Sequence, residues 1–216
     1  MNASQLVVGI TTAGPVEVAL LGGGHDICAN SEKGALESLP ALLADVLQRA
    51  ACTIADVTLI GVCTGPGSFT GLRIGVAFAK TLAQARRLPI VGISTYDAAS
   101  LYVSSLPIVA VARGKRDHYY ARLIAGPTSS PQLIQGSKEA IERAAAELGR
   151  PGSPAPIVGA DFSVTQPGDG ARAVAQLARL AQARGQDLHW TNIAIDYGQR
   201  PNAVVNWERR HGVQSS

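Results

Sequence analysis

The sequence predicts an α/β protein with two lobes, and three observations lead to that prediction. Apolar runs of the kind found in buried strands alternate with stretches of helical spacing, as between residues 57–63 and 72–85. After residue 106 the order of strands followed by a helix begins again. The 216 residues, 46% hydrophobic and 16% charged, suffice for one large or two small packed domains. We therefore expect one lobe over residues 1–104 and another over 105–216.

The individual strands and helices are expected from apolar spacing and from the turn and cap residues between the runs. In the first lobe we expect strands at 6–10, 17–21, 25–29, 57–63 and 89–93, and helices at 36–50, 72–85 and from Ser94 or Thr95 to about 103. In the second lobe we expect strands at 107–112, 118–124, 132–134 and 157–159, and helices at 138–148 and 171–184. Ser137 should cap the helix that starts at residue 138. The tail over 196–216 shows no period.

Composition and charge exclude several classes of protein. The first lobe holds 6 basic and 7 acidic side chains and the second holds 13 and 9, so the net charge of +3 comes from the second half. That excess is thinly spread and is typical of a solvated surface. No apolar run is long enough to cross a bilayer, and no basic and apolar leader follows Met1. We expect a cytoplasmic protein that does not enter a membrane and whose three cysteines stay reduced.

A glycine-rich turn stands between an expected buried strand and an expected helix. Its candidate nucleotide-binding residues are Gly65, Gly67, Ser68, Thr70 and Gly71. Backbone amides at such a turn can cradle an anion, but no Lys-Ser or Lys-Thr pair of a Walker A loop follows, and the spacing is one residue too long for the dinucleotide fingerprint. The alternative is a tight strand-to-helix turn in which Ser68 or Thr70 caps the helix. The spacing favours this second interpretation.

The helix over 72–85 carries apolar residues almost all round, which is typical of a helix buried on every side. A strip of small residues also recurs every fourth position along it, at Gly71, Gly75, Ala79 and Ala83. Such a strip lets a second helix approach closely. A helix of a partner chain and the protein's own core are both compatible with this pattern.

No catalytic group of residues emerges from the spacing. The four histidines are isolated from one another, so a metal-hydrolase or structural zinc site is not expected. No G-x-S-x-G elbow presents a serine nucleophile. Cys63 lies in an expected buried strand, where an inert thiol is the common case.

Residues 62–94 nevertheless resemble a known signature. The stretch Gly-Pro-Gly-Ser-Phe-Thr-Gly-Leu-Arg-Ile-Gly at 65–75 is similar to that of the TsaB (YeaZ) family, proteins required to make threonylcarbamoyladenosine in tRNA. The opening strand over 6–12, the Leu39-Pro40 helix and the turn and strand at 113–122 support the resemblance. It covers most of residues 1–125.

The resemblance implies a two-lobed fold of the actin-like ATPase class and a non-catalytic role. It implies a TsaD-like catalytic subunit as heterodimer partner, a TsaE-like ATPase in the assembly, indirect contact with tRNA, and a homodimer when the chain is alone. No cofactor is expected in the isolated chain, with ATP or ADP expected only at the interface with the partner. The helices over 36–50 and 72–85 form the family's dimer surface, so the expected partner interface comprises Leu36, Leu39, Leu43, Leu47, Gly71, Leu72, Gly75, Ala79, Leu82 and Ala83.

The sequence departs from the family pattern where nucleotide chemistry would need an acid. Thr11 stands at the usual aspartate position of the first loop, and Ala112 lies near a second such position. Gly34 stands near the place of a common histidine. A hydroxyl at residue 11 cannot replace a carboxylate that helps to position a metal and nucleotide. Two alternatives stay open: a nucleotide-binding enzyme of the actin-like fold, either a kinase or a carbamoyl-transferring ATPase, and a glycoprotease-like peptidase.

Overall fold

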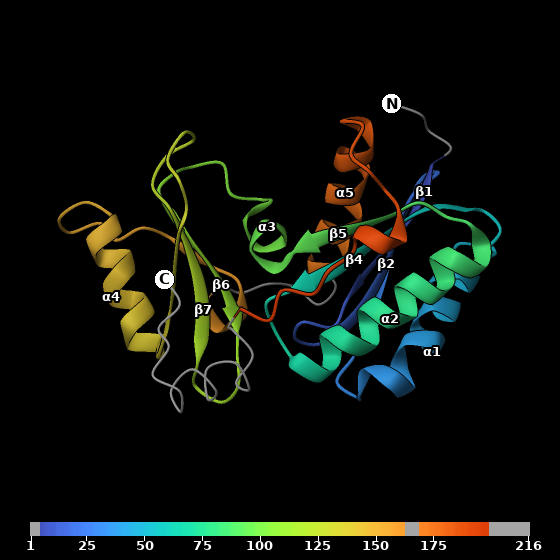
Figure 1. Cartoon of the computed structure of the whole chain (residues 1–216), viewed down its shortest axis with the longest axis horizontal. Helices are drawn as coiled ribbons and strands as arrows, with labels where there is room; N and C mark the ends of the chain where they lie inside the picture. Colours follow the sequence, from blue (N-terminus) through green and yellow to red (C-terminus); the bar gives the residue numbers. More distant parts are fainter. Residues whose placement is uncertain (1–4, 163–168, 199–216) are drawn as a thin grey trace, which may run out of the picture.

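The protein folds into two lobes, each built on one mixed β-sheet (Figure 1). A computed structural model describes residues 5–162 and 169–198. The first sheet has the strand order β3-β2-β1-β4-β5, and the second has the order β8-β7-β6-β9. The predicted α/β class is confirmed.

The elements lie close to their predicted positions. The strands are β1 Leu6–Thr11, β2 Val16–Gly22, β3 His25–Ser31, β4 Val57–Gly65, β5 Ile90–Ser94, β6 Ile108–Arg113, β7 Tyr119–Ile124, β8 Gln132–Gly136 and β9 Ile157–Val158. The helices are α1 Ala35–Arg49, α2 Phe69–Arg86, α3 Thr95–Ser100, α4 Lys138–Leu148 and α5 Asp169–Ala183, with short 3-10 turns η1 Ala160–Phe162 and η2 Trp190–Asn192. Beyond Gly198, the tail expected over 196–216 lies outside the described residues.

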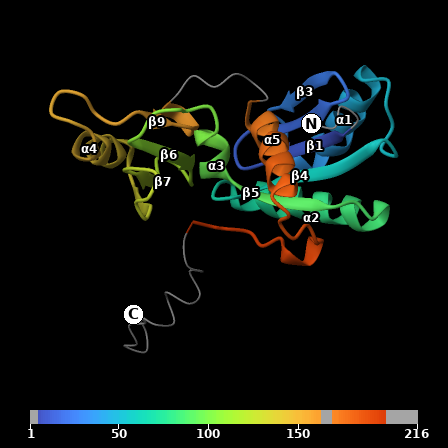
Figure 2. The same ribbon diagram turned by 90° about the horizontal axis from the view of Figure 1, so that it is seen from above.

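Strand β1 is the central strand of the first sheet and is buried along its whole length. It pairs antiparallel with β2 and parallel with β4, so that Val8 has Leu20 and Ile60 as its two neighbours. Its unbroken apolar run is what a strand covered on both faces requires. Helices α1 and α2 cover one face of the sheet and α5 covers the other (Figures 1 and 2).

Helix α5 comes from the second half of the chain but packs on the first sheet, against β1, β2 and β4. The approach is close: a Cβ atom added to Gly9 on β1 would lie 2.1 Å from the Ala171 carbonyl oxygen. Ala175 and Ala178 on α5 are fully buried in the same contact. The two sheets are separated in the chain by the segment between Ser94 and Ile108. We propose that the lobe boundary lies in this segment, at residues 104 and 105, and that α5 is counted with the first lobe.

Residues 187–198, here called the strap, cross back over the first lobe beside α2 (Figure 2). The Ile90 amide donates to the Leu188 carbonyl at 2.9 Å, and the Asp196 amide donates to the Thr64 carbonyl at 2.8 Å. Lys80 Nζ on α2 donates to the Ile193 carbonyl at 3.0 Å. The strap thereby ties α2 to the edge of the sheet.

The strip of small residues on α2 faces the protein's own sheet. Gly75, Ala79 and Ala83 are buried, and a Cβ atom added to Gly75 would lie 2.2 Å from Thr12 Oγ1. Thr12 is itself 1% exposed and follows β1 directly. The close approach that the strip permits is therefore used inside the chain, between α2 and the end of β1.

We expect Gly75→Leu to destabilise the protein, because the added side chain does not fit in the close contact with Thr12. Overpacking of this kind typically lowers the free energy of unfolding by about 1–3 kcal/mol. Ala77→Leu, on the exposed side of the same helix, is the matched control and should leave stability nearly unchanged. Thermal and urea unfolding of both variants measure the difference. Equal stability of the two would contradict the inward orientation of the strip.

The Thr12 hydroxyl makes no hydrogen bond although its oxygen is buried. A buried polar group without a partner costs about 1–3 kcal/mol, so we expect Thr12→Val to keep or raise the free energy of unfolding. Thr12→Ser retains the hydroxyl, loses a buried methyl group and should lower that free energy. Urea unfolding measures the free energy of unfolding of the three proteins, which should be lowest with Ser and at least as high with Val as with Thr. A clearly lower free energy of unfolding in the valine variant would contradict the assignment.

Candidate partner groove and interlobe cleft

The glycine-rich turn joins β4 to α2 and is held by its own hydrogen bonds. Ser68 is the N-cap of α2, and its Oγ accepts from the Gly71 amide at 3.2 Å. The Ser68 amide donates to the Ala13 carbonyl at 2.8 Å. Two amides that an anion would need are thus already engaged, and the geometry is that of a capped strand-to-helix turn.

A cleft of about 590 Å³ lies between the lobes. Its charged lining residues are Glu17, Glu32, Lys33, Arg113 and Asp161. The buried Glu17 carboxylate accepts from the Ala171 amide in the first turn of α5 at 3.0 Å, a favourable place for a negative charge.

Neither Asp161 nor the side chain at residue 11 offers a free carboxylate for a magnesium–nucleotide pair. Asp161 forms an ion pair with Arg113 at 3.1 Å and accepts a hydrogen bond from the Tyr119 hydroxyl at 2.8 Å, which raises the pKa of Tyr119. Thr11 Oγ1 accepts from the Ala13 amide at 3.4 Å and supplies no charge. Residues 5–162 and 169–198 contain no group of three His, Cys, Asp or Glu side chains that could hold a metal ion. For these reasons the described residues of the cleft do not fit a magnesium–nucleotide pair.

Cys63 lines the same cleft but is a poor nucleophile. It is 1% exposed, and burial raises the pKa of its thiol. Its Sγ lies 3.2 Å from Thr95 Oγ1.

The histidines of the described chain are far apart in the sequence and each contacts a different side chain. His25 contacts Cys52, His118 contacts Gln135, and His189 contacts Thr191. His211 lies outside the described residues.

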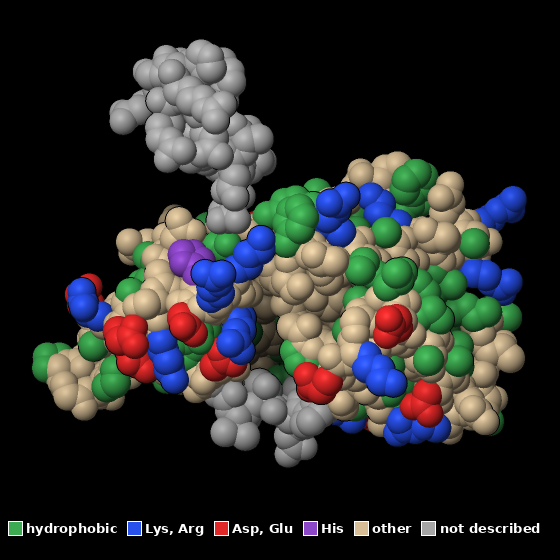
Figure 3. Space-filling view, turned by 90° about the horizontal axis from the view of Figure 1, so that it is seen from below, with side chains coloured by type: hydrophobic (Ala, Val, Ile, Leu, Met, Phe, Trp, Pro, Cys, Tyr) green, Lys and Arg blue, Asp and Glu red, His purple; other side chains and the backbone are tan. Residues whose placement is uncertain are grey.

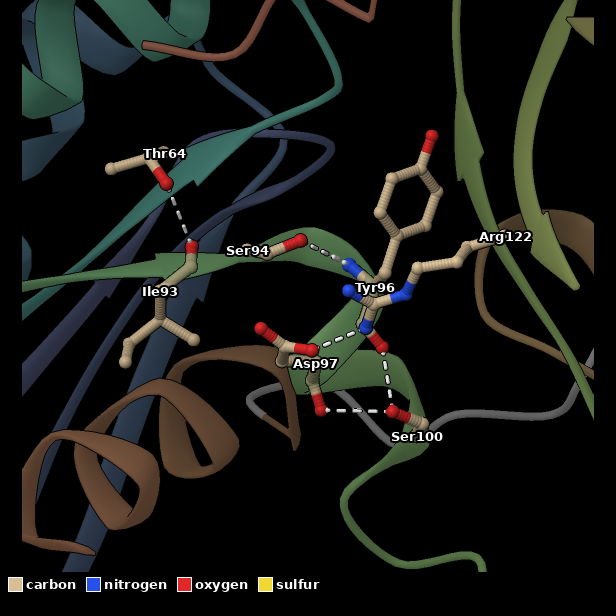
Figure 4. Close-up of polar contacts among 7 residues, drawn as sticks. All are labelled: Thr64, Ile93, Ser94, Tyr96, Asp97, Ser100 and Arg122. Carbon is tan, nitrogen blue, oxygen red and sulfur yellow. Dashed lines mark hydrogen bonds and ion pairs between the residues drawn. The ribbon is translucent and has the colours of Figure 1, made fainter. Parts of the chain in front are cut away.

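The two lobes meet at an ion pair between residues that no local sequence pattern brings together (Figure 4). Arg122 on β7 pairs with Asp97 on α3 and lies over the Tyr96 ring, with the guanidinium carbon 5.1 Å from the ring centroid. Ser94 caps α3 by accepting from the Tyr96 amide at 3.2 Å. Burial, with the charge of Asp196, raises the pKa of Tyr96 to about 12, so this phenol stays neutral at physiological pH. The junction holds the lobes together and offers no acid–base group.

The outer surface of α1 and α2 forms a second depression, here called the groove, of about 600 Å³. Its lining is almost wholly apolar and consists of Ala35, Leu36, Leu39, Pro40, Phe69, Thr70, Arg73, Ile74, Ala77, Phe78 and Thr81. Leu36 is 74% exposed and Phe69 is 47% exposed. Large apolar side chains gathered on a protein surface mark an interaction site.

The structure distributes the ten expected interface residues over both faces of the two helices. Leu36 is exposed in the groove, and Leu39 lines it although it is 1% exposed. Gly71 and Leu82 are half-buried. Leu43, Leu47, Leu72, Gly75, Ala79 and Ala83 are buried in the protein's own core.

The expectation that the small-residue strip meets a partner helix is therefore corrected. Four-residue spacing shows that positions share a face but not which way that face points. The outward face of α2 instead presents Ile74, Ala77, Phe78 and Thr81, which the spacing did not single out. An interface on α1 and α2 stays a prediction, now carried by the groove.

Within the described residues no helix combines the length and apolar character needed to span a bilayer.

Residues 28–188, about three quarters of the chain, match the TsaD family, described as tRNA N6-adenosine threonylcarbamoyltransferase. The tRNA N6-adenosine threonylcarbamoyltransferase of Gluconobacter oxydans is 41% identical over 81 residues, which are 37% of this chain and 21% of that protein. The tRNA threonylcarbamoyladenosine biosynthesis protein TsaB of Escherichia coli is 39% identical over 54 residues, 25% of this chain and 23% of that one.

The structure of YeaZ from Pseudomonas aeruginosa superimposes with a TM-score of 0.68 at 20% identity, covering 89% of this chain and 99% of that one. That likeness supports the two-lobed actin-like fold. The chain spans less than a quarter of the length of the two sequence relatives above. The family match and the shared fold confirm the resemblance drawn from residues 62–94, and the chain belongs to the TsaD-type family as a TsaB (YeaZ)-like member.

Proposed function

We propose that this protein is a non-catalytic subunit of the machinery that makes threonylcarbamoyladenosine in tRNA, and that it binds and activates a TsaD-type threonylcarbamoyltransferase. The names of its relatives support the pathway. The observation that carries the subunit role is the groove on α1 and α2, an apolar surface with Leu36 and Phe69 exposed. A helical pair of a related fold would cover Leu36 and the apolar side chains beside it.

The interlobe cleft supports the non-catalytic part of the proposal. Glu17 is bound to the first turn of α5, and Asp161 is paired with Arg113. Neither carboxylate is free to bind a metal ion or to act as a general base without breaking a contact that holds the fold. We propose that ATP or ADP, where the assembly needs one, lies at the joint interface with the TsaD-type subunit, that a TsaE-type ATPase joins the complex, and that the complex works in the cytoplasm.

The two alternative functions have no comparable support. A kinase or carbamoyl-transferring ATPase would need an anion-binding turn and an acid near Thr11. Two amides of the glycine-rich turn are already engaged, and residue 11 supplies no carboxylate. A peptidase would need a nucleophile or a metal, while Cys63 is buried and carries a raised pKa.

We expect Leu36→Glu to abolish co-elution with the cognate TsaD-type subunit, because it places a charge at the centre of an apolar contact. Leu36 is 74% exposed, so the variant should fold normally. Leu133→Glu is the matched control, since Leu133 on β8 is 67% exposed and lies in the other lobe. Size-exclusion chromatography of both variants with the partner decides the matter. If the Leu36 variant still co-elutes, the groove is not the interface.

A second expected outcome concerns the isolated chain, which should neither hydrolyse ATP nor modify tRNA. The cleft lacks a carboxylate at Thr11, and its Glu17 and Asp161 carboxylates are already engaged in contacts within the fold. Phosphate release from ATP and mass spectrometry of tRNA nucleosides measure these activities, with the TsaD-type complex as the positive control. Turnover by the purified chain that disappears in a Gly67→Val variant would overturn the assignment.

A further inference from the structure

Helix α2 carries only positive charges. Its residues include Arg73, Lys80 and Arg86, its C-cap is Arg87, and none of its residues is Asp or Glu. Arg73, Arg86 and Arg87 are exposed, and Lys80 is half-buried beneath the strap. Figure 3 shows Lys and Arg side chains along the upper margin of the first lobe.

Aromatic rings accompany these cations along the helix. The Arg73 guanidinium carbon lies 5.5 Å from the Phe69 ring centroid, and Lys80 Nζ lies 5.8 Å from the Trp190 ring centroid. Phe69 also contacts the Tyr197 ring at 4.9 Å between centroids. We call this set of residues the α2 edge: Phe69, Arg73, Lys80, Arg86, Arg87, Trp190 and Tyr197.

The α2 edge combines a row of cations with aromatic rings at the surface, Phe69 being 47% exposed and Trp190 and Tyr197 half-buried. Surfaces that bind single-stranded nucleic acid combine the same two features. Phe69 and Lys80, the residue beside the Trp190 ring, are eleven positions apart in the chain, which is about 16 Å along the helix. The strap contributes two acids. The Asp187 carboxylate accepts a hydrogen bond from the Asn192 side chain, and the Asp196 carboxylate accepts one from the Gly198 amide. The four cations outnumber them.

We propose that the α2 edge binds a single-stranded segment of the tRNA substrate. The proposal rests on the proposed function, which brings tRNA to the complex. Phe69 and Arg73 also line the groove, so the RNA would run along the border between this chain and its partner. The non-catalytic subunit then contributes part of the RNA-binding surface, and tRNA contacts this chain directly.

The test measures binding of an unmodified tRNA transcript to the full chain at several salt concentrations, by fluorescence anisotropy. In Arg86→Gln/Arg87→Gln two exposed charges are removed from the edge without touching the groove. We expect the slope of log affinity against log salt to fall by about one to two and the affinity to drop severalfold. Arg143→Gln/Arg150→Gln removes two exposed charges from the second lobe and is the matched control, with little change expected.

The stacking part of the proposal is tested with Trp190. Trp190→Ala should weaken tRNA binding about fivefold or more, whereas Trp190→Phe keeps a ring and should retain most of the affinity. Equal losses of tRNA affinity in the two arginine double variants would overturn the proposal. It would also be overturned if Trp190→Ala bound tRNA as tightly as the parent chain, because the rings would then serve only to hold the strap. Co-elution of each variant with the TsaD-type subunit separates this failure from failure of the proposed function, since the edge can fail while the complex still forms.

Discussion

The contact between β1 and the start of α5 is the constraint on which the rest of the structure depends. Gly9 lets the helix backbone come within van der Waals range of the strand, and the Glu17 carboxylate on the next strand accepts from the Ala171 amide. This pair of interactions joins residues more than 150 positions apart in the chain. Because α5 is fixed here, the second lobe inserts between two parts of the first, and the strap that follows α5 is directed back across β4 and α2.

The same packing decides which surfaces remain for binding. The sheet is closed by α5 on one side and by the inner faces of α1 and α2 on the other, and the apolar side chains on the outer surface of α1 and α2 line the groove. Gly75 and Thr12 hold α2 tightly against β1, which gives the groove a rigid floor. A rigid apolar surface loses little conformational entropy when a partner covers it.

Much of this fold could be predicted from the sequence because its strands are unbroken apolar runs and its helices have ordinary caps. Ser68, Ser94 and Ser137 cap the helices as their spacing indicates. The orientation of the small-residue strip could not be predicted, since Gly75 and Ala79 repeat at the same interval whether they face a partner or the core. The Arg122–Asp97 junction depends on β7 meeting α3 across the lobes, a tertiary contact that leaves no local pattern.

The threonine at residue 11 is explained by the strand register. Thr11 on β1 is the cross-strand partner of Glu17 on β2, and Glu17 is buried and bound to the first turn of α5. An aspartate at residue 11 would stand opposite that carboxylate, and like charges directly opposite each other destabilise an antiparallel pair. One of the two acids would then have to bind a proton or leave its place, and the contact that fixes α5 would weaken. In this chain a carboxylate at residue 11 would therefore compete with the Glu17 carboxylate that fastens α5, which supports the proposal that function lies on the outer surfaces of α1 and α2.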